Sequence, residues 1–154
     1  MNLVDQFFSG DLSFFLNQID DAIVIIDGKG TLLFLNQAFT RITGLDPIPY
    51  FGKNMQELVN LGLIQKESGG LRAIASKKTA RTNVTYQGGA TLTWTHVPIL
   101  DRDGEISIVV GTGRDVTRLV EMEAEVQQSK TIINNYSQKL NELKNSLGIG
   151  NVIY

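Results

Sequence analysis

The fold class is decided by one stretch, residues 22–35, which reads AIVIIDGKGTLLFL. Two apolar runs, the first rich in β-branched residues, flank the segment from Asp27 to Gly30, whose residues are typical of tight turns. The stretch therefore predicts a β-hairpin with strands over 22–27 and 31–35.

Outward from this hairpin, turn residues divide the chain into further elements. Asn36 is a suitable N-cap for a helix that ends before Gly44. Short helices are also expected near 11–19, 54–60 and 70–77, and strands over 80–87, 90–100 and 105–114. Five strands joined mostly by tight turns predict an antiparallel sheet. The helices that lie between the strands must cover one face of it, which makes the fold α+β.

A long helix is expected from about Asp115 onward, and it carries the most regular pattern in the chain. At alternating steps of three and four, eight of nine positions are apolar: Leu119, Met122, Val126, Ser129, Ile133, Tyr136, Leu140, Leu143 and Leu147. This spacing is typical of a coiled-coil seam. The helix would be roughly 45 Å long, which favours pairing with a second copy over packing on its own small domain. We therefore predict a homodimer.

Composition excludes several classes of function. The chain has 154 residues and a net charge of -2, so it lacks the basic excess of a nucleic-acid-binding protein. It has no cysteine, and no apolar run approaches the ~20 residues of a membrane span. No signal peptide, phosphate-binding loop, metal-ligand cluster or nucleophile–base pair is recognisable. We expect a cytoplasmic, non-enzymatic protein without a metal site.

Four short motifs, taken in order, resemble the PAS domain family. DDAIVIIDGKG at 20–30 looks like the family's first strand and turn, and NQAF with the following TG at 36–44 looks like its first inner helix. VPI with the turn DRDG at 97–104, and RDVT at 114–117, look like its last turn and the ending that leads into a signalling helix. The resemblance covers about residues 12–118. It implies the PAS fold with a long C-terminal coiled-coil helix.

The resemblance also implies a domain order and a signalling function. The expected parts are an N-terminal flanking segment at 1–19, a PAS domain at 20–116, a signalling helix at 117–147 and the start of a linker at 148–154. LGIGNVIY at 147–154 is similar to the linker that enters the AAA+ domain of sigma-54-dependent activators. We therefore expect the sensory part of a transcription regulator whose effector domain follows. A sensor histidine kinase, which uses the same domain and helix, stays open.

PAS domains hold ligands between the sheet and the middle helices, and strand alternation then selects candidate residues. The family's inward positions fall on alternate residues of the last two strands, with two glycines that either leave room for a ligand or admit Phe51 or Leu71. Arginine side chains nearby are candidates for an anionic ligand. The candidate ligand-binding residues are Leu92, Trp94, His96, Gly111, Gly113, Arg72 and Arg81. The facing of strand 80–87 stays unassigned.

The cofactors known in the family can be tested by the residues they need. Light-oxygen-voltage domains need a reactive cysteine, which this chain lacks, and haem-binding PAS domains use a histidine in the helix before the second hairpin. Residues 71–75 contain none, and His96 lies on a strand. Covalent flavin and haem are therefore not expected. Non-covalent flavin, a small metabolite or no ligand at all stay open.

The junction between the last strand and the long helix is expected to carry the signal. No flexible linker separates them, so Asp115 and Thr117 would pass a change in strand packing directly to the helix. The alternative is a constitutive dimerisation module with a fully packed core and no ligand.

Overall fold

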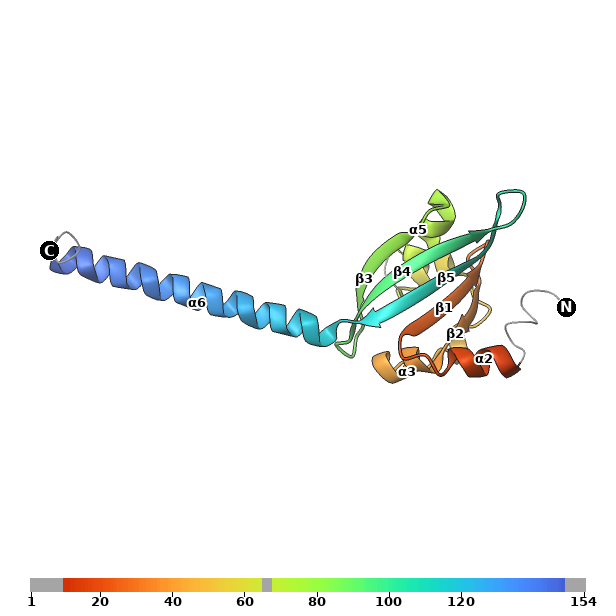
Figure 1. The fold of residues 1–154 in the computed structure, drawn as a ribbon, viewed down its shortest axis with the longest axis horizontal. Helices are drawn as coiled ribbons and strands as arrows, with labels where there is room; N and C mark the ends of the chain where they lie inside the picture. Colours follow the sequence, from red (N-terminus) through yellow and green to blue (C-terminus); the bar gives the residue numbers. More distant parts are fainter. Residues whose placement is uncertain (1–9, 65–67, 149–154) are drawn as a thin grey trace. The chain divides into compact units, whose positions relative to one another are not determined.

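The structure is a computed structural model, and it describes residues 10–64 and 68–148 (Figure 1). The chain divides into two units, 1–117 and 118–154. The predicted linker at 148–154 and the start of the flanking segment lie almost entirely outside the described residues. The described elements are α2 (Gly10–Leu16), β1 (Ala22–Asp27), β2 (Leu32–Leu35), α3 (Gln37–Thr43), η1 (Ile48–Tyr50), α4 (Met55–Asn60), α5 (Gly69–Ser76), β3 (Ala80–Thr85), β4 (Thr91–Leu100), β5 (Ile106–Asp115) and α6 (Thr117–Leu147).

Five strands form one antiparallel sheet in the order β2-β1-β5-β4-β3, which confirms the α+β prediction. β2 and β3 are the two edge strands. The segment that joins them therefore crosses the whole sheet, and it contains α3, η1, α4 and α5 (Figure 1). This crossing places the short helices on one face, which we call the inner face.

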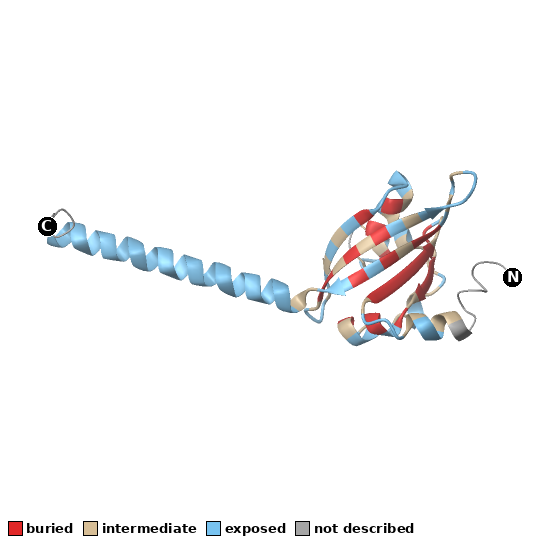
Figure 2. Ribbon diagram, in the orientation of Figure 1, coloured by how far each residue is buried: buried red, intermediate tan, exposed pale blue. Residues whose placement is uncertain are grey.

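The core has a larger cluster on the inner face and a smaller one on the outer face. Val24, Ile26, Leu92, Trp94 and Val109 belong to the inner cluster. In Figure 2, β1 is a continuous red band, whereas buried and more exposed residues alternate along β4 and β5. The outer cluster lies on β1, β2 and β5, where Leu16 of α2 packs against it. Helix α2, which precedes the first strand, thus partly covers the outer face, while the helices between β2 and β3 cover the inner face as expected.

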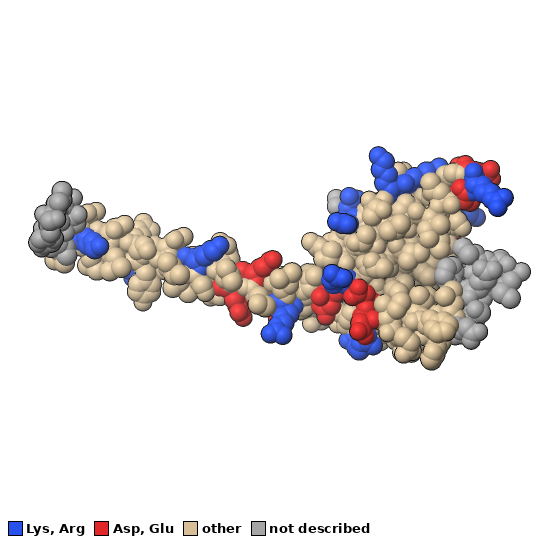
Figure 3. Space-filling view, viewed as in Figure 1, with Lys and Arg blue, Asp and Glu red and all other residues tan. Residues whose placement is uncertain are grey.

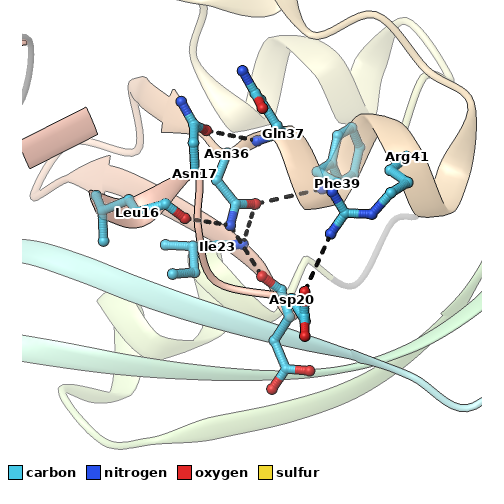
Figure 4. A network of polar contacts seen from close by, with 9 residues as sticks. Leu16, Asn17, Asp20, Ile23, Asn36, Gln37, Phe39 and Arg41 are labelled. Atoms are coloured by element: carbon cyan, nitrogen blue, oxygen red, sulfur yellow. Dashed lines mark hydrogen bonds and ion pairs between the residues drawn. The ribbon is translucent and has the colours of Figure 1, made fainter. Parts of the chain in front are cut away.

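Asn36 ties three elements together at the start of α3, where the sequence predicted only a helix cap. Its Oδ1 accepts hydrogen bonds from Ile23 N (2.8 Å) and Phe39 N (3.4 Å), and its Nδ2 donates to Leu16 O and Asp21 O, both at 3.0 Å (Figure 4). The side chain is 1% exposed. A buried amide that satisfies four backbone groups fixes α2, β1 and α3 relative to one another.

Two local details differ from the expectation. The first helix ends at Leu16 rather than near residue 19, and Phe15 and Ile19 are exposed. The turn η1 was not anticipated; it begins directly after Pro47, a residue that suits the start of a helix. The expected helix near 36–43 is confirmed, with Gly44 in the left-handed conformation at φ 73°.

Helix α6 is the second unit, and it is 31 residues long. Every residue from Arg118 to Leu147 is exposed, including all the apolar members of the predicted seam. Gly148 follows the helix at φ 69°, as expected of a C-terminal glycine.

Candidate functional site

A cavity of about 460 Å³ lies between the inner face of the sheet and the helices that cross it. Strand residues Val24, Leu32 and Thr82 line it, together with Phe39 of α3 and Met55 of α4. Its size falls within the range of sites for small organic ligands, which are also mostly apolar with a few polar groups.

Aromatic rings form one wall of the cavity. Trp94 stacks on His96 with 5.6 Å between ring centroids, and Phe39 meets Tyr86 edge-to-face at 5.7 Å. The Trp94 Nε1 group donates to the Tyr86 hydroxyl (2.9 Å). Burial raises the pKa of Tyr86 to about 12, so this phenol is neutral at physiological pH. The wall is therefore uncharged and rigidly packed.

His96 is the polar centre of this wall. Its side chain is buried, and burial lowers its pKa to about 4, so the imidazole is neutral at physiological pH. Nδ1 has no hydrogen-bond partner, and the same holds for Oγ1 of Thr82 on the neighbouring strand. Both residues line the cavity. Buried polar atoms without partners are rare in folded proteins, so this pair calls for an explanation.

The two inner-face glycines of β5 make room for side chains of the sheet itself. A Cβ on Gly111 would lie 2.5 Å from Val24 Cγ1 and 2.7 Å from His96 Cδ2, and one on Gly113 would lie 3.0 Å from Trp94 ring atoms. The residues that fill this space are thus cross-strand neighbours, so neither of the two alternatives left open by the sequence, a ligand or Phe51 or Leu71, occupies it. The reason is register: Gly111 pairs with both Val24 and His96, and Gly113 with Trp94.

The structure separates the predicted ligand-binding residues into two groups. Trp94 and His96 line the cavity, whereas Leu92 is fully buried in the core, and Gly111 and Gly113 lie behind the two rings. Arg72 and Arg81 are exposed and lie outside the cavity lining. The Arg72 guanidinium donates to the Arg81 carbonyl oxygen (3.3 Å).

No Lys, Arg, Asp or Glu lines the cavity among the described residues. On the face drawn in Figure 3, charged side chains of both signs lie on the exterior. The described residues also contain no group of three potential metal ligands, and none of their helices is both long and apolar enough to cross a membrane. The arrangement suits a neutral ligand better than an anion.

Sequence reasoning missed five lining residues in the segment 80–87, because it did not assign the faces of this strand: Thr82, Val84, Thr85, Tyr86 and Gln87. Thr82, Val84 and Tyr86 face the cavity, whereas Arg81 and Asn83 are exposed. The alternation itself was visible in the sequence, but its phase was not. Gly69 was missed as well: a Cβ there would lie 2.5 Å from His96 Nδ1, so only glycine lets α5 approach the imidazole this closely.

A chain of hydrogen bonds leads from the cavity to the start of α6. Thr85 lines the cavity, and its Oγ1 lies 3.0 Å from Thr91 Oγ1. The Thr91 backbone accepts from Val116 N and donates to Thr117 Oγ1, both at 2.9 Å. Asp115 Oδ1 accepts from Thr117 N (3.0 Å) and from its hydroxyl. The predicted junction residues are therefore bonded both to each other and to the sheet.

An antiparallel five-stranded sheet with helices and a cavity on one face defines a small α+β domain that can enclose a ligand. A family model described as PAS fold matches residues 16–121, more than half of the chain. The chain belongs to the PAS family of sensory and signalling domains. No curated protein gives a significant match.

Solved structures share this fold at low sequence identity. An RNA-binding light-oxygen-voltage receptor aligns with a TM-score of 0.57 and 20% identity, over 86% of this chain and 39% of that one. The RsLOV d2 variant aligns at 0.54 and 16%, over 75% and 69%. The PAS domain of the fruit-fly ELK potassium channel aligns at 0.52 and 11%, over 76% and 99%. At such identities these likenesses concern the fold alone.

Proposed function

We propose that this chain is a cytoplasmic, non-catalytic sensor that binds a small molecule in the inner cavity and signals through a dimeric α6. The observation that carries the proposal is the junction. A residue of the cavity wall, Thr85, is linked through Thr91 to Thr117, the first residue of α6. Ligand binding that alters the β3–β4 hairpin would therefore act directly on the helix start.

The signal requires a ligand that prefers one arrangement of this junction over another. β4 supplies both Trp94 and His96 to the cavity and pairs along its length with β5, which ends at Asp115. The rings of His96 and Trp94 pack directly against the β5 backbone at Gly111 and Gly113. A shift of either ring would therefore displace β5, because close-packed interiors transmit strain.

The exposed seam of α6 supports dimerisation. In the single chain its apolar side chains, such as Ile133 and Leu140, are more than half exposed, although a heptad pattern normally faces a partner helix. A second copy in parallel would bury the seam along the helix. It would also bring two effector domains together, which we propose to be AAA+ domains of a transcription regulator, with a histidine kinase as the second candidate. ATPase and autophosphorylation assays on the intact protein distinguish these two effectors.

Native mass spectrometry before and after mild denaturation tests the proposal. The expected result is a dimer with extra mass that leaves on unfolding. A dimer without extra mass, which also fails to bind any added small molecule, would favour a ligand-free dimerisation module. A monomer at micromolar concentration would contradict the dimer.

Matched variants of α6 locate the dimer interface. Ile133→Asp and Leu140→Asp place a charge on the seam and should abolish the dimer, because an unpaired buried charge costs several kcal/mol. Gln138→Asp adds the same charge at an exposed position on the opposite side of the heptad and should leave the dimer intact. Analytical ultracentrifugation of the three variants decides between the seam and another interface.

A further inference from the structure

We propose that the free edge of β3 is a docking site for an extended, acidic segment of a partner protein, which adds to the sheet as a sixth strand. This interaction goes beyond the small-molecule site of the proposed function. Two observations carry it: the edge of β3 has unpaired backbone groups, and the chain around it carries only positive charges.

The hydrogen bonds of the β3–β4 hairpin show which backbone groups are free. β3 is an edge strand and pairs with β4 on one side only (Figure 1). Because Tyr86 N donates to Ala90 O, the even-numbered residues of β3 bond to β4, and the odd-numbered residues direct their N–H and C=O groups to the free edge. Among the described residues, none bonds to the backbone of Asn83 or Thr85 on this edge. Such a row of groups is a template for a further strand.

The opposite edge of the sheet is different, because the chain itself covers part of it. Leu32 of β2 donates its backbone N–H to Lys53 O (2.9 Å) and accepts from Gly52 N (2.8 Å). Thr31 forms an isolated bridge with Asn54. Of the two edges, β3 is therefore the one that is open to a partner.

The charges around β3 indicate the chemistry of that partner. Residues 68–100 contain Arg72, Lys77, Lys78 and Arg81 and no Asp or Glu, although the whole chain has a net charge of -2. Figure 3 shows Lys and Arg side chains over the part of the domain where Figure 1 draws α5 and β3. Lys77 pairs with Glu105 (3.6 Å), whereas the other three have no ion pair with a described residue. The Arg72 guanidinium donates to the Arg81 carbonyl oxygen (3.3 Å), so it lies at the edge itself.

These charges favour an acidic strand over a second copy of this chain. Two β3 edges would bring like charges together across the new strand pair, which is destabilising. Side chains of an added strand would alternate between the two faces of the sheet. On the inner face they would lie beside Thr82 and Val84, which line the cavity, and on the outer face beside Arg81 and Asn83, which are exposed. The fitting segment therefore alternates apolar and acidic residues.

The test measures binding of an end-blocked peptide of alternating valine and glutamate to the full chain by fluorescence anisotropy, with a neutral fluorophore. It should bind with a Kd below about 1 mM, and the same peptide with lysine for glutamate should not bind. Two further peptides carry N-methyl groups on all glutamates or on all valines. Amide groups of alternate residues point to opposite edges of a strand, so one methylated peptide should bind at least about tenfold more weakly and the other like the parent.

Matched charge reversals locate the site on the protein. Arg81→Glu should weaken binding of the acidic peptide about tenfold and allow the lysine peptide to bind. Arg102→Glu, in the exposed β4–β5 turn, changes the net charge equally and should alter neither. Asn83→Pro removes an N–H group that points to the free edge and should abolish binding, since proline is tolerated at such positions. Thermal melts of the three variants verify that each is folded.

Several results would overturn the inference. Equal binding of the two methylated peptides would show attraction between charges without strand pairing. Equally tight binding of an oligouridylate would assign the positive side chains to nucleic acid instead. Unchanged binding by Arg81→Glu, or no binding of the acidic peptide at about 1 mM, would place no partner on this edge. None of these results bears on the small-molecule site, which native mass spectrometry tests separately.

Discussion

His96 lies directly opposite Gly111 in the β4–β5 ladder, and its imidazole occupies the space that a side chain at position 111 would need. Val24 closes the same space from β1 on the other side. The position of the imidazole in the cavity wall thus depends on a residue without a side chain on the neighbouring strand.

Gly111→Ala should therefore destabilise the domain by about 2 kcal/mol, because the new methyl overlaps two packed side chains. Gly88→Ala is the control, since its Cβ would meet only Thr43 O at an ordinary 3.5 Å. Urea denaturation measures both free energies of unfolding. Equal free energies of unfolding for the two variants would mean that the sheet accommodates the new methyl group at no cost in stability. That result would contradict the tight packing around Gly111.

Burial of His96 predicts a specific pH dependence of stability. Its pKa falls from 6.5 to about 4 in the folded chain, because burial disfavours the charged imidazolium. Between these values the unfolded chain binds a proton that the folded chain does not. The free energy of unfolding is therefore greatest above pH 6.5 and falls as the pH is lowered towards 4, by a total on the order of 3 kcal/mol.

The measurement is chemical denaturation at a series of pH values, compared with His96→Gln. Above roughly pH 5 carboxylates contribute little, and His96 is the single histidine of the chain, so the slope in that range belongs to it. The variant should lose this slope. A wild-type slope that persists in His96→Gln would show that another group titrates.

Local chemistry made much of the fold predictable, as the start of α3 shows. The Asn36 side chain accepts a hydrogen bond from Phe39 N at the start of the helix, and Gly44 takes the left-handed conformation at its end. Both end signals are local, so they can be predicted without the rest of the fold. The three-dimensional role of Asn36 was not visible, because its partners Leu16, Asp21 and Ile23 come from other elements.

The cavity was only half predictable, and the reason is register. Thr85 pairs with Thr91, and Tyr86 N donates to Ala90 O, so the hairpin loop consists of Gln87, Gly88 and Gly89. The strands predicted from the sequence, 80–87 and 90–100, leave only Gly88 and Gly89 for the turn. A difference of one residue reverses the face of every side chain in the strand, which is why Thr82 could not be assigned. The partners of Gly111 were hidden for the same reason, since they depend on the pairing of distant strands.

Asn36→Ala should destabilise the domain by about 3 kcal/mol, because Ile23 N and two backbone acceptors lose this partner together. Phe39 N keeps a second partner, the backbone carbonyl oxygen of residue 36. Asn36→Asp should also destabilise it, since a carboxylate would face the Leu16 and Asp21 carbonyl oxygens at the position of the amide. Asn83→Ala, at an exposed position on β3, is the control and should change stability little. A thermal melt monitored by circular dichroism ranks the three. A stable Asn36→Ala variant would contradict the role assigned to this network.

The junction at Asp115 and Thr117 predicts that signal transfer depends on helix phase. Two residues inserted after Thr117 rotate the rest of α6 by about 200°, whereas seven residues restore the phase of the seam while adding about 10 Å. In the protein with its effector attached, the two-residue insertion should abolish the response and the seven-residue insertion should keep it. Both variants should retain cavity binding and melting temperature, because the hydrogen bonds among Thr91, Asp115 and Thr117 precede the insertion. A normal response from the two-residue variant would show that the signal does not pass through a rigid strand-to-helix junction, and loss of response in both would show that distance matters as well as phase.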